Sequence, residues 1–376
     1  MMIGFNKPYL SGKEIEYISE AVASKKISGD GLFTKKCHDF FEKTYGFKKV
    51  LLTTSCTDAL EMAAILLNIK EGDEVIAPSY TFVSTVNAFV LRGAKIVFVD
   101  SGNDNPNMDV SKIEALITSK TKVILPVHYA GIACDMDAIM ALATKYNLYV
   151  IEDAAQAIDS YYKGKPLGSI GHLAAFSFHE TKNIISGEGG MLVINDAQFI
   201  ERAEIIREKG TNRSQFFRGQ VDKYGWVDIG SSFLPSDIIA AFLFAQLQNI
   251  SSIQNRRKEI WNLYHSKLKS LKEKNIQLPY LDNFATNNAH MYYIVCHSLE
   301  QRTALIEYLK GFEIYAVFHY QSLHKSTYIQ AQNSEISTLP YCEKYTDCLV
   351  RLPMYFELTN DEVNCVIEKI VQFFNL

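Results

Sequence analysis

Four short apolar runs alternate with amphipathic stretches in the first half of the chain. The runs are "EVIAP" (74–78), "KIVFVD" (95–100), "KVILPVH" (122–128) and "LYVIEDAA" (148–155), and helical spacing appears at 111–118 and 136–146. Strands that are apolar on both faces need cover on both faces, and helices between successive strands favour a parallel order. The pattern therefore predicts an α/β fold with a mostly parallel sheet and helices on both of its faces.

The pattern changes near residue 240. Residues 237–274 form one long helical tract with a break near Ser251, and shorter segments with strand or helix character follow at 291–298, 303–311 and 314–320. We therefore predict a large α/β domain over residues 1–245 and a small α+β domain over residues 246–376.

A separate helix is predicted over residues 11–24. Ser11 and Glu14 have the spacing of a capping box, in which each side chain bonds the backbone N–H of the other. We expect this helix to pack on the small domain. A further helix is predicted to begin near Cys56.

Composition limits the partners of the chain. The net charge is -4 and the pI is about 6.2, so no basic excess favours nucleic acid or an anionic membrane. The N-terminal residues lack a signal-peptide pattern, and no apolar run reaches the roughly 18 residues of a membrane span. The 7 cysteines form no CxxC pair. We expect reduced thiols in a cytoplasmic protein with no metal site.

Polar side chains follow the predicted strands, where a doubly wound sheet binds its ligands. Asp153 follows 148–152, His128 ends 122–128, and His179 and Lys182 follow a strand that starts at Ala174. The "TTSCT" segment leads into a helix whose free N–H groups would suit a phosphate.

Each of these residues also has a purely structural explanation. Cys56 and Thr57 could simply begin a helix, Phe82 could lie in the core, and Asp153 could cap the next helix. A lone lysine is usually solvated. The glycines of "GEGG" (187–190) lack the GxGxxG spacing of a dinucleotide site.

Taken together, the residues favour one use, which is to hold pyridoxal phosphate. A lysine amine reacts with the cofactor's aldehyde, and a carboxylate beside the ring nitrogen keeps that nitrogen protonated. An aromatic face can stack on the ring, and a helix start can bind the phosphate. Lys182, Asp153, Phe82 and the helix start near Cys56 provide these groups.

The sequence resembles the DegT/DnrJ/EryC1/StrS sugar-nucleotide aminotransferases over nearly its whole length. The matching motifs are "GDGLFTKKCHDFFEK" (29–43), "TDALEMAA" (57–64), "PSYTFVSTVNA" (78–88), "EDAAQA" (152–157), "FSFHETKN" (176–183) and "GEGGMLVIND" (187–196). The resemblance implies the fold type I architecture of aspartate aminotransferase and a homodimer with shared active sites.

By this resemblance, Lys182 would hold the cofactor covalently and Asp153 would pair with the ring nitrogen. Gln156 would lie near the ring hydroxyl and Phe82 would stack on the ring. Cys56, Thr57 and Ser177 would serve the phosphate. Ser232 takes the place of an asparagine that, in relatives, reaches the phosphate of the neighbouring subunit.

Residues 204–232 resemble the branch that aminates dTDP-4-keto-6-deoxy-D-glucose with L-glutamate, which gives dTDP-4-amino-4,6-dideoxy-D-galactose for surface polysaccharides. Arginine forks suit a diphosphate, so we expect Arg213, Phe217 and Arg218 to clamp the nucleotide sugar. The alternative is a solvated surface loop. His319, Tyr320 and His324 are expected to reach the same cleft.

Other activities remain open at this point. The product could carry a 3-amino or an equatorial 4-amino group. A sugar dehydratase on the same fold is disfavoured, because such relatives have histidine at the position of Lys182. A catalytically silent regulatory protein is disfavoured by the intact Asp153 and Lys182 pair.

Overall fold

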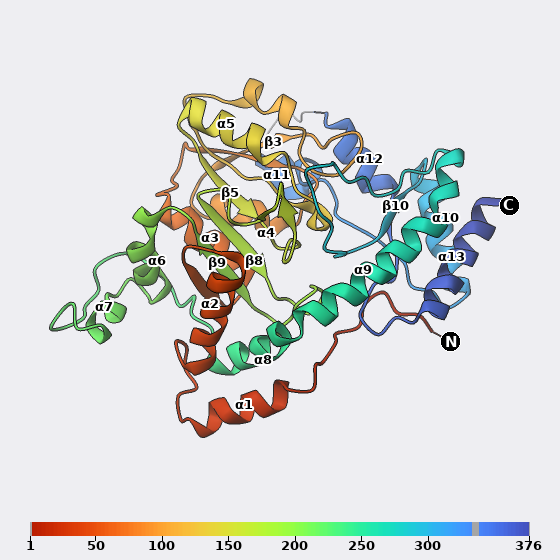
Figure 1. Ribbon diagram of the computed structural model, residues 1–376. Helices are drawn as coiled ribbons and strands as arrows, with labels where there is room; N and C mark the ends of the chain where they lie inside the picture. The colour runs from red at the N-terminus through yellow and green to blue at the C-terminus, as the bar shows by residue number, and fades with distance from the viewer. Residues whose placement is uncertain (1, 333–337, 376) are drawn as a thin grey trace.

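A seven-stranded sheet organises the N-terminal two thirds of the chain (Figure 1). The computed structural model describes residues 2–332 and 338–375. From one edge to the other, the strands are β1 (Val50–Thr53), β9 (Gly190–Ile194), β8 (Leu173–Ser177), β5 (Tyr149–Asp153), β4 (Thr121–Ile124), β2 (Glu74–Pro78) and β3 (Lys95–Val99). The strands from β8 to β3 are parallel, and β9 is antiparallel to both of its neighbours. The predicted mostly parallel sheet is confirmed.

Helices cover both faces of this sheet, because side chains of alternate strand residues are buried on opposite faces. One apolar cluster joins the sheet to α2 (Leu32–Tyr45), α5 (Met136–Tyr146) and α8 (Asp237–Gln248). The other joins it to α3 (Cys56–Leu66), α4 (Val83–Val90) and α6 (Ile200–Arg207). Between α6 and α8, a segment with the short helix α7 (Arg213–Phe217) extends away from the body (Figure 1).

Two predicted helices differ from the structure. Residues 111–118 form two short 3-10 turns, Val110–Lys112 and Glu114–Leu116, because the Asp109 carboxylate accepts from the Ser111 N–H and favours a tight turn. The tract 237–274 divides into α8, α9 (Ile250–Lys267) and a 3-10 segment (Lys269–Lys274). The break lies at Asn249, two residues before the predicted Ser251.

The C-terminal part contains a second sheet and its own apolar cluster. The strands β10 (Tyr293–Val295), β12 (Leu349–Arg351) and β11 (Val317–Phe318) are antiparallel, with β12 in the centre. The helices of this part are α10 (Leu299–Gly311), α11 (Thr327–Gln332), α12 (Pro340–Cys348) and α13 (Asn360–Asn375). A two-stranded hairpin, β6 (Tyr161–Tyr162) and β7 (Lys165–Pro166), completes the strands of the described chain. The domain boundary at 245/246 stays a prediction.

The N-terminal helix α1 (Glu14–Ala23) packs along α8, which crosses the predicted boundary at 245/246, so its packing on the small domain stays a prediction. The contact with α8 involves the buried carboxylate of Glu14. It accepts hydrogen bonds from the Ser11 and Gly12 N–H groups at 2.7 and 2.9 Å and from the Gln246 amide of α8 at 2.6 Å. The segment before α1 contacts the C-terminal part, where the centroids of the Tyr9 and Phe356 rings are 3.9 Å apart.

The described helices include none that is both long and apolar enough to cross a membrane.

Candidate active site

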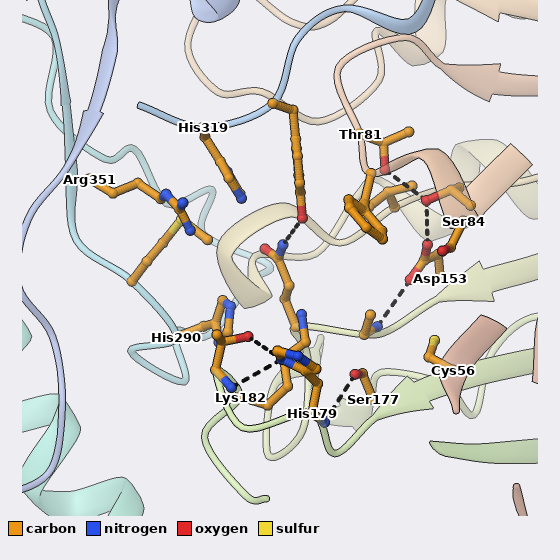
Figure 2. A pocket seen from close by; sticks show the side chains of 18 of the residues that line it. Cys56, Thr81, Ser84, Asp153, Ser177, His179, Lys182, His290, His319 and Arg351 are labelled. Carbon is orange, nitrogen blue, oxygen red and sulfur yellow. Dashed lines mark hydrogen bonds between the residues drawn. The ribbon is translucent and has the colours of Figure 1, made fainter. Parts of the chain in front are cut away.

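A cavity of about 770 Å³ lies at the carboxyl ends of the parallel strands, where the C-terminal sheet faces them (Figure 2). Nine of the predicted site residues line it: Cys56, Thr57, Phe82, Asp153, Gln156, Ser177, Lys182, His319 and Tyr320. They come from five separate segments of the chain. The fold thus brings together the residues for which the sequence predicted a common use.

Asp153, the last residue of β5, is held rigidly in this cavity. One carboxylate oxygen accepts from the Thr85 hydroxyl at 2.7 Å, and the other accepts from the Ala155 N–H at 3.1 Å. Burial raises the pKa of Asp153, while these hydrogen bonds and the nearby Lys182 oppose that rise. A cation placed beside the carboxylate would therefore stabilise its ionised form.

Lys182 follows β8 in a tight turn, where its N–H donates to the His179 carbonyl at 2.9 Å. Burial lowers the pKa of Lys182, and the neighbouring Asp153 carboxylate only partly offsets this effect. A lower pKa increases the fraction of neutral amine, and the neutral amine is the nucleophile.

The start of α3 lines one end of the cavity. The Ser55 side chain caps the helix by accepting from the Asp58 N–H, whereas in the described chain the N–H groups of Cys56 and Thr57 have no acceptor. A Cβ on Gly190 would lie 2.4 Å from the Cys56 nitrogen, so only glycine lets β9 approach this helix start so closely. Free N–H groups at the end of an 11-residue helix fit a phosphate.

Aromatic and amide side chains complete the cavity wall. The Phe82 side chain lines the cavity and is 55% exposed, and its ring centroid lies 6.1 Å from that of Tyr320. The Gln156 amide accepts from the Ala130 N–H at 2.6 Å and donates to the Tyr320 hydroxyl at 2.9 Å. His319 stacks on Tyr320 with centroids 3.6 Å apart. The carboxylate, the amine, the free N–H groups and the ring together fit pyridoxal phosphate.

Five predicted site residues do not line this cavity: Ser232, Arg213, Phe217, Arg218 and His324. Ser232 is exposed, and its backbone forms an isolated antiparallel β-bridge with Glu208. In α7, the Arg213 guanidinium stacks on Phe217 at 5.1 Å, and just after it Arg218 pairs with Glu204 at 2.8 Å. The prediction that these side chains meet His319 and Tyr320 is therefore not fulfilled within one chain.

His324 is a packing residue, which corrects the expectation that it reaches the cleft. Its Nδ1 is 2.6 Å from the Ser79 hydroxyl and its Nε2 is 3.3 Å from the Glu343 carboxylate. These contacts join the end of β2 to α12. His128 is likewise a hydrogen-bonded core histidine, 3.0 Å from the buried Glu152 carboxylate.

Sequence reasoning missed two basic residues of the cavity, His290 and Arg351 (Figure 2). The His290 Nδ1 is 2.8 Å from the amide oxygen of Asn183, the residue that follows Lys182 in the sequence. Arg351 ends β12 and lines the cavity from the C-terminal sheet. The one available signal was an arginine inside the otherwise apolar run "CLVRLPM" (348–354).

Comparison with known proteins agrees with this site. The profile of the DegT/DnrJ/EryC1/StrS aminotransferase family matches residues 8–371. GDP-perosamine synthase of Escherichia coli O157:H7 is 34% identical over 98% of each chain. The spore coat polysaccharide biosynthesis protein SpsC of Bacillus subtilis is 31% identical over 97% of this chain and 95% of its own.

A solved structure shows the same fold over the whole chain. The putative sugar aminotransferase Spr1654 of Streptococcus pneumoniae in its PMP form superimposes with a TM-score of 0.91, at 27% identity and 99% coverage of each chain. A PLP form of that protein has the same TM-score. The chain described here therefore belongs to the DegT/DnrJ/EryC1/StrS aminotransferase family, and it is a pyridoxal phosphate-dependent sugar aminotransferase.

Proposed function

We propose that this enzyme transfers the amino group of L-glutamate to dTDP-4-keto-6-deoxy-D-glucose and forms dTDP-4-amino-4,6-dideoxy-D-galactose for a cell-surface polysaccharide. The observation that carries the reaction type is that Lys182, Asp153 and the start of α3 line one cavity. When bound, pyridoxal phosphate supplies an aldehyde that takes up the amino group and a ring that stabilises negative charge on the reacting carbon.

The protein residues have separate tasks in this proposal. The Lys182 amine holds the cofactor at rest and, once released, moves a proton to and from the reacting carbon. Asp153 keeps a positive charge on the ring nitrogen, and its hydrogen bond from Thr85 fixes the carboxylate in position. Phe82 would lie against the ring, and the Cys56 and Thr57 N–H groups would bind the phosphate. Burial raises the pKa of Cys56 well above its usual value, so its neutral thiol does not repel that phosphate.

We propose further that two copies of the chain share their active sites. The segment around α7 exposes large apolar side chains, among them Phe217 at 69% and Trp226 at 82%. Exposed aromatic groups next to arginines are typical of surfaces that bind a partner. None of Ser232, Arg213, Phe217 and Arg218 lines the cavity of its own chain. In a homodimer, these residues would instead contribute to the cavity of the partner subunit.

Arg218 tests this arrangement. We expect Arg218→Ala to lower kcat/KM for the sugar nucleotide by about 10- to 100-fold, the range for a lost hydrogen bond to a charged group. The half-reaction with glutamate should change little, since glutamate has no diphosphate. Glu204→Gln is the matched control, because it breaks the Arg218 ion pair but keeps the guanidinium. An equal loss in Glu204→Gln would mean that Arg218 only anchors α7.

Mixed dimers then show in which subunit Arg218 acts. When Lys182→Ala chains are mixed with Arg218→Ala chains, random pairing puts one intact site in each mixed dimer. Activity at low sugar-nucleotide concentration should return to about a quarter of the unmutated level. A mixture no more active than its Arg218→Ala component would refute a shared site, as would an active monomer in sedimentation.

The product identifies the substrate. Incubation with glutamate and either dTDP- or GDP-4-keto-6-deoxy sugar, followed by NMR, should show a 4-amino group with axial nitrogen on the dTDP sugar. The GDP-linked sugar is the second candidate, because a relative with 34% identity is a GDP-perosamine synthase. A preference for GDP, or a 3-amino or equatorial 4-amino product, would reject the proposed substrate and leave the aminotransferase assignment unchanged.

A further inference from the structure

His290 has one ring nitrogen bound to the protein and one that is free. Its Nδ1 lies 2.8 Å from the amide oxygen of Asn183. Its Nε2 has no hydrogen-bond partner among the described residues, and the side chain lines the cavity. Figure 2 shows His290 on the same side of the cavity as Arg351, opposite Cys56 and Asp153. The free nitrogen is therefore available to a ligand, and the kind of ligand depends on which nitrogen carries the proton.

The amide of Asn183 fixes the position of that proton. The Asn183 Nδ2 donates to the Asn288 carbonyl and to the Gln254 amide oxygen, each at 2.8 Å. A backbone carbonyl only accepts, so the amide nitrogen faces Asn288 and the amide oxygen faces His290. An amide oxygen also only accepts, so the His290 Nδ1 carries the proton and donates it. The ring therefore has its lone pair on Nε2.

The His290 ring is also neutral. Burial lowers its pKa well below the usual range, and nearby positive charges, first among them that of Lys182, lower it further. In the described chain, no carboxylate lies within 4.0 Å of the ring nitrogens of His290 to favour the charged form. Three other histidines do have such a carboxylate: His128, His179 and His324. Near pH 7, the His290 Nε2 is therefore an acceptor and not a donor.

Backbone contacts hold His290 near the reacting amine. Its N–H donates to the Asn288 amide oxygen at 3.0 Å, and its carbonyl accepts from the Arg257 guanidinium at 2.7 Å. Asn183, which binds the ring, directly follows Lys182 in the sequence. The ring is thus tied to the turn that carries the amine, which positions Nε2 for groups next to the reacting carbon of a substrate.

A neutral acceptor at this place selects among the groups that the two substrates offer. The carboxylates of an amino acid only accept hydrogen bonds, and its amine is the group that reacts. A sugar hydroxyl can donate. In a 4-keto-6-deoxy hexose, the keto carbon C4 lies between C3, which carries a hydroxyl, and C5, which carries the methyl group. The C3 hydroxyl is therefore the one donor on a carbon next to the reacting carbon.

We propose that the His290 Nε2 accepts a hydrogen bond from the C3 hydroxyl of the sugar substrate and so contributes to the choice of sugar. This inference rests on the proposed function, because it takes a 4-keto-6-deoxy sugar as the substrate. It gives the two ring nitrogens separate tasks: Nδ1 holds the ring to Asn183, and Nε2 contacts the sugar. Glutamate has no hydroxyl at this place, so Nε2 serves only the half-reaction with the sugar.

Two substitutions of His290 separate the tasks of its nitrogens. The short amide of His290→Asn can take the place of Nδ1 and keep a donor for Asn183, but it puts nothing at the place of Nε2. The longer amide of His290→Gln can bring its oxygen near the place of Nε2, but it leaves Asn183 without its donor. His265→Asn is the matched control, because His265 lies 3.4 Å from the Tyr292 hydroxyl and outside the cavity. Thermal unfolding monitored by circular dichroism should show that all three variants fold.

Single-turnover kinetics of the two half-reactions then locate the effect. In His290→Asn, the second-order rate constant with the sugar should fall about 3- to 10-fold, the range for one hydrogen bond between uncharged groups, and that with glutamate should change less than about twofold. His290→Gln should recover part of the loss, and His265→Asn should match the unmutated enzyme. With a 3-deoxy analogue of the sugar nucleotide, His290→Asn should react within about twofold of the unmutated enzyme, because the partner hydroxyl is gone.

Equal losses in both half-reactions would overturn the inference and would show that His290 acts only through Asn183 and the turn of Lys182. An unchanged sugar half-reaction in His290→Asn, or a loss that persists with the 3-deoxy analogue, would overturn it as well. The assays use the dTDP- or the GDP-linked sugar, whichever the unmutated enzyme aminates, since both carry the C3 hydroxyl. A wrong nucleotide in the proposed function would therefore appear in the unmutated enzyme and not as a difference between variants.

A further measurement on His290 needs no substrate. In ¹⁵N NMR spectra of the holoenzyme with labelled histidine, the ring signals that are missing from His290→Asn should show a single proton, on Nδ1, near pH 7. A proton on Nε2, or protons on both nitrogens, would overturn the inference whatever sugar the enzyme aminates.

Discussion

Lys182→Ala should reduce transamination by at least about 10⁴-fold, the scale of loss when one member of a catalytic unit is deleted. No other lysine lines the cavity in the described chain, so no second amine can replace it. After borohydride treatment of the unmutated enzyme, peptide mass mapping should find the cofactor on the single peptide that contains Lys182. The variant should carry no covalent cofactor.

Lys163→Ala is the control for this substitution. Lys163 is an exposed lysine paired with Asp137 at 2.6 Å, outside the cavity, and its removal should leave both activity and covalent attachment unchanged. Full transamination by Lys182→Ala, or borohydride labelling of a different lysine, would show that Lys182 is not the attachment site.

Asp153→Asn should lower the rate by about 10²- to 10³-fold, which corresponds to about 3–4 kcal/mol of lost charge stabilisation. Asparagine has nearly the same shape and can still accept from Thr85 or Ala155, but it cannot balance a protonated ring nitrogen. Single-turnover rates of both half-reactions should fall together, since both need the ring to accept charge. Melting temperature is measured in parallel to confirm folding.

Thr85→Val is the companion variant, because it removes the hydrogen bond to Asp153 and keeps the carboxylate charge. A smaller rate loss than in Asp153→Asn is expected. A loss of tenfold or less in Asp153→Asn would indicate that Asp153 mainly organises the chain after β5 and does not stabilise the charged ring.

The sequence was sufficient to predict the part of the site that the parallel sheet builds. Asp153 ends β5 and Lys182 follows β8, and these strands are neighbours in the sheet, so both positions could be predicted from the strand ends. The start of α3 could be recognised in the same way, from the polar segment that precedes an apolar helix. Such local signals do not depend on how distant parts of the chain pack.

The remaining contacts depend on that packing. Arg351 enters the cavity only because the C-terminal sheet faces the carboxyl ends of the parallel strands, and no local pattern gives that orientation. His324 was misassigned because its contacts cannot be read from neighbouring residues. Its partner Ser79 lies 245 residues earlier in the chain, and its partner Glu343 lies 19 residues later. Glu14 likewise directs α1 onto α8 through a buried bond to Gln246, more than two hundred residues away.

The enzyme is expected to pass nitrogen from donor to sugar in two separable steps. The direct measurement is to incubate the holoenzyme with ¹⁵N-glutamate, remove all small molecules by gel filtration, and then add the 4-keto sugar nucleotide alone. We expect about one ¹⁵N-labelled amino sugar per active site, because the enzyme retains the nitrogen between substrates. Unlabelled sugar nucleotide after this second step, from an enzyme with full cofactor content, would show that the enzyme does not carry the nitrogen from one substrate to the other.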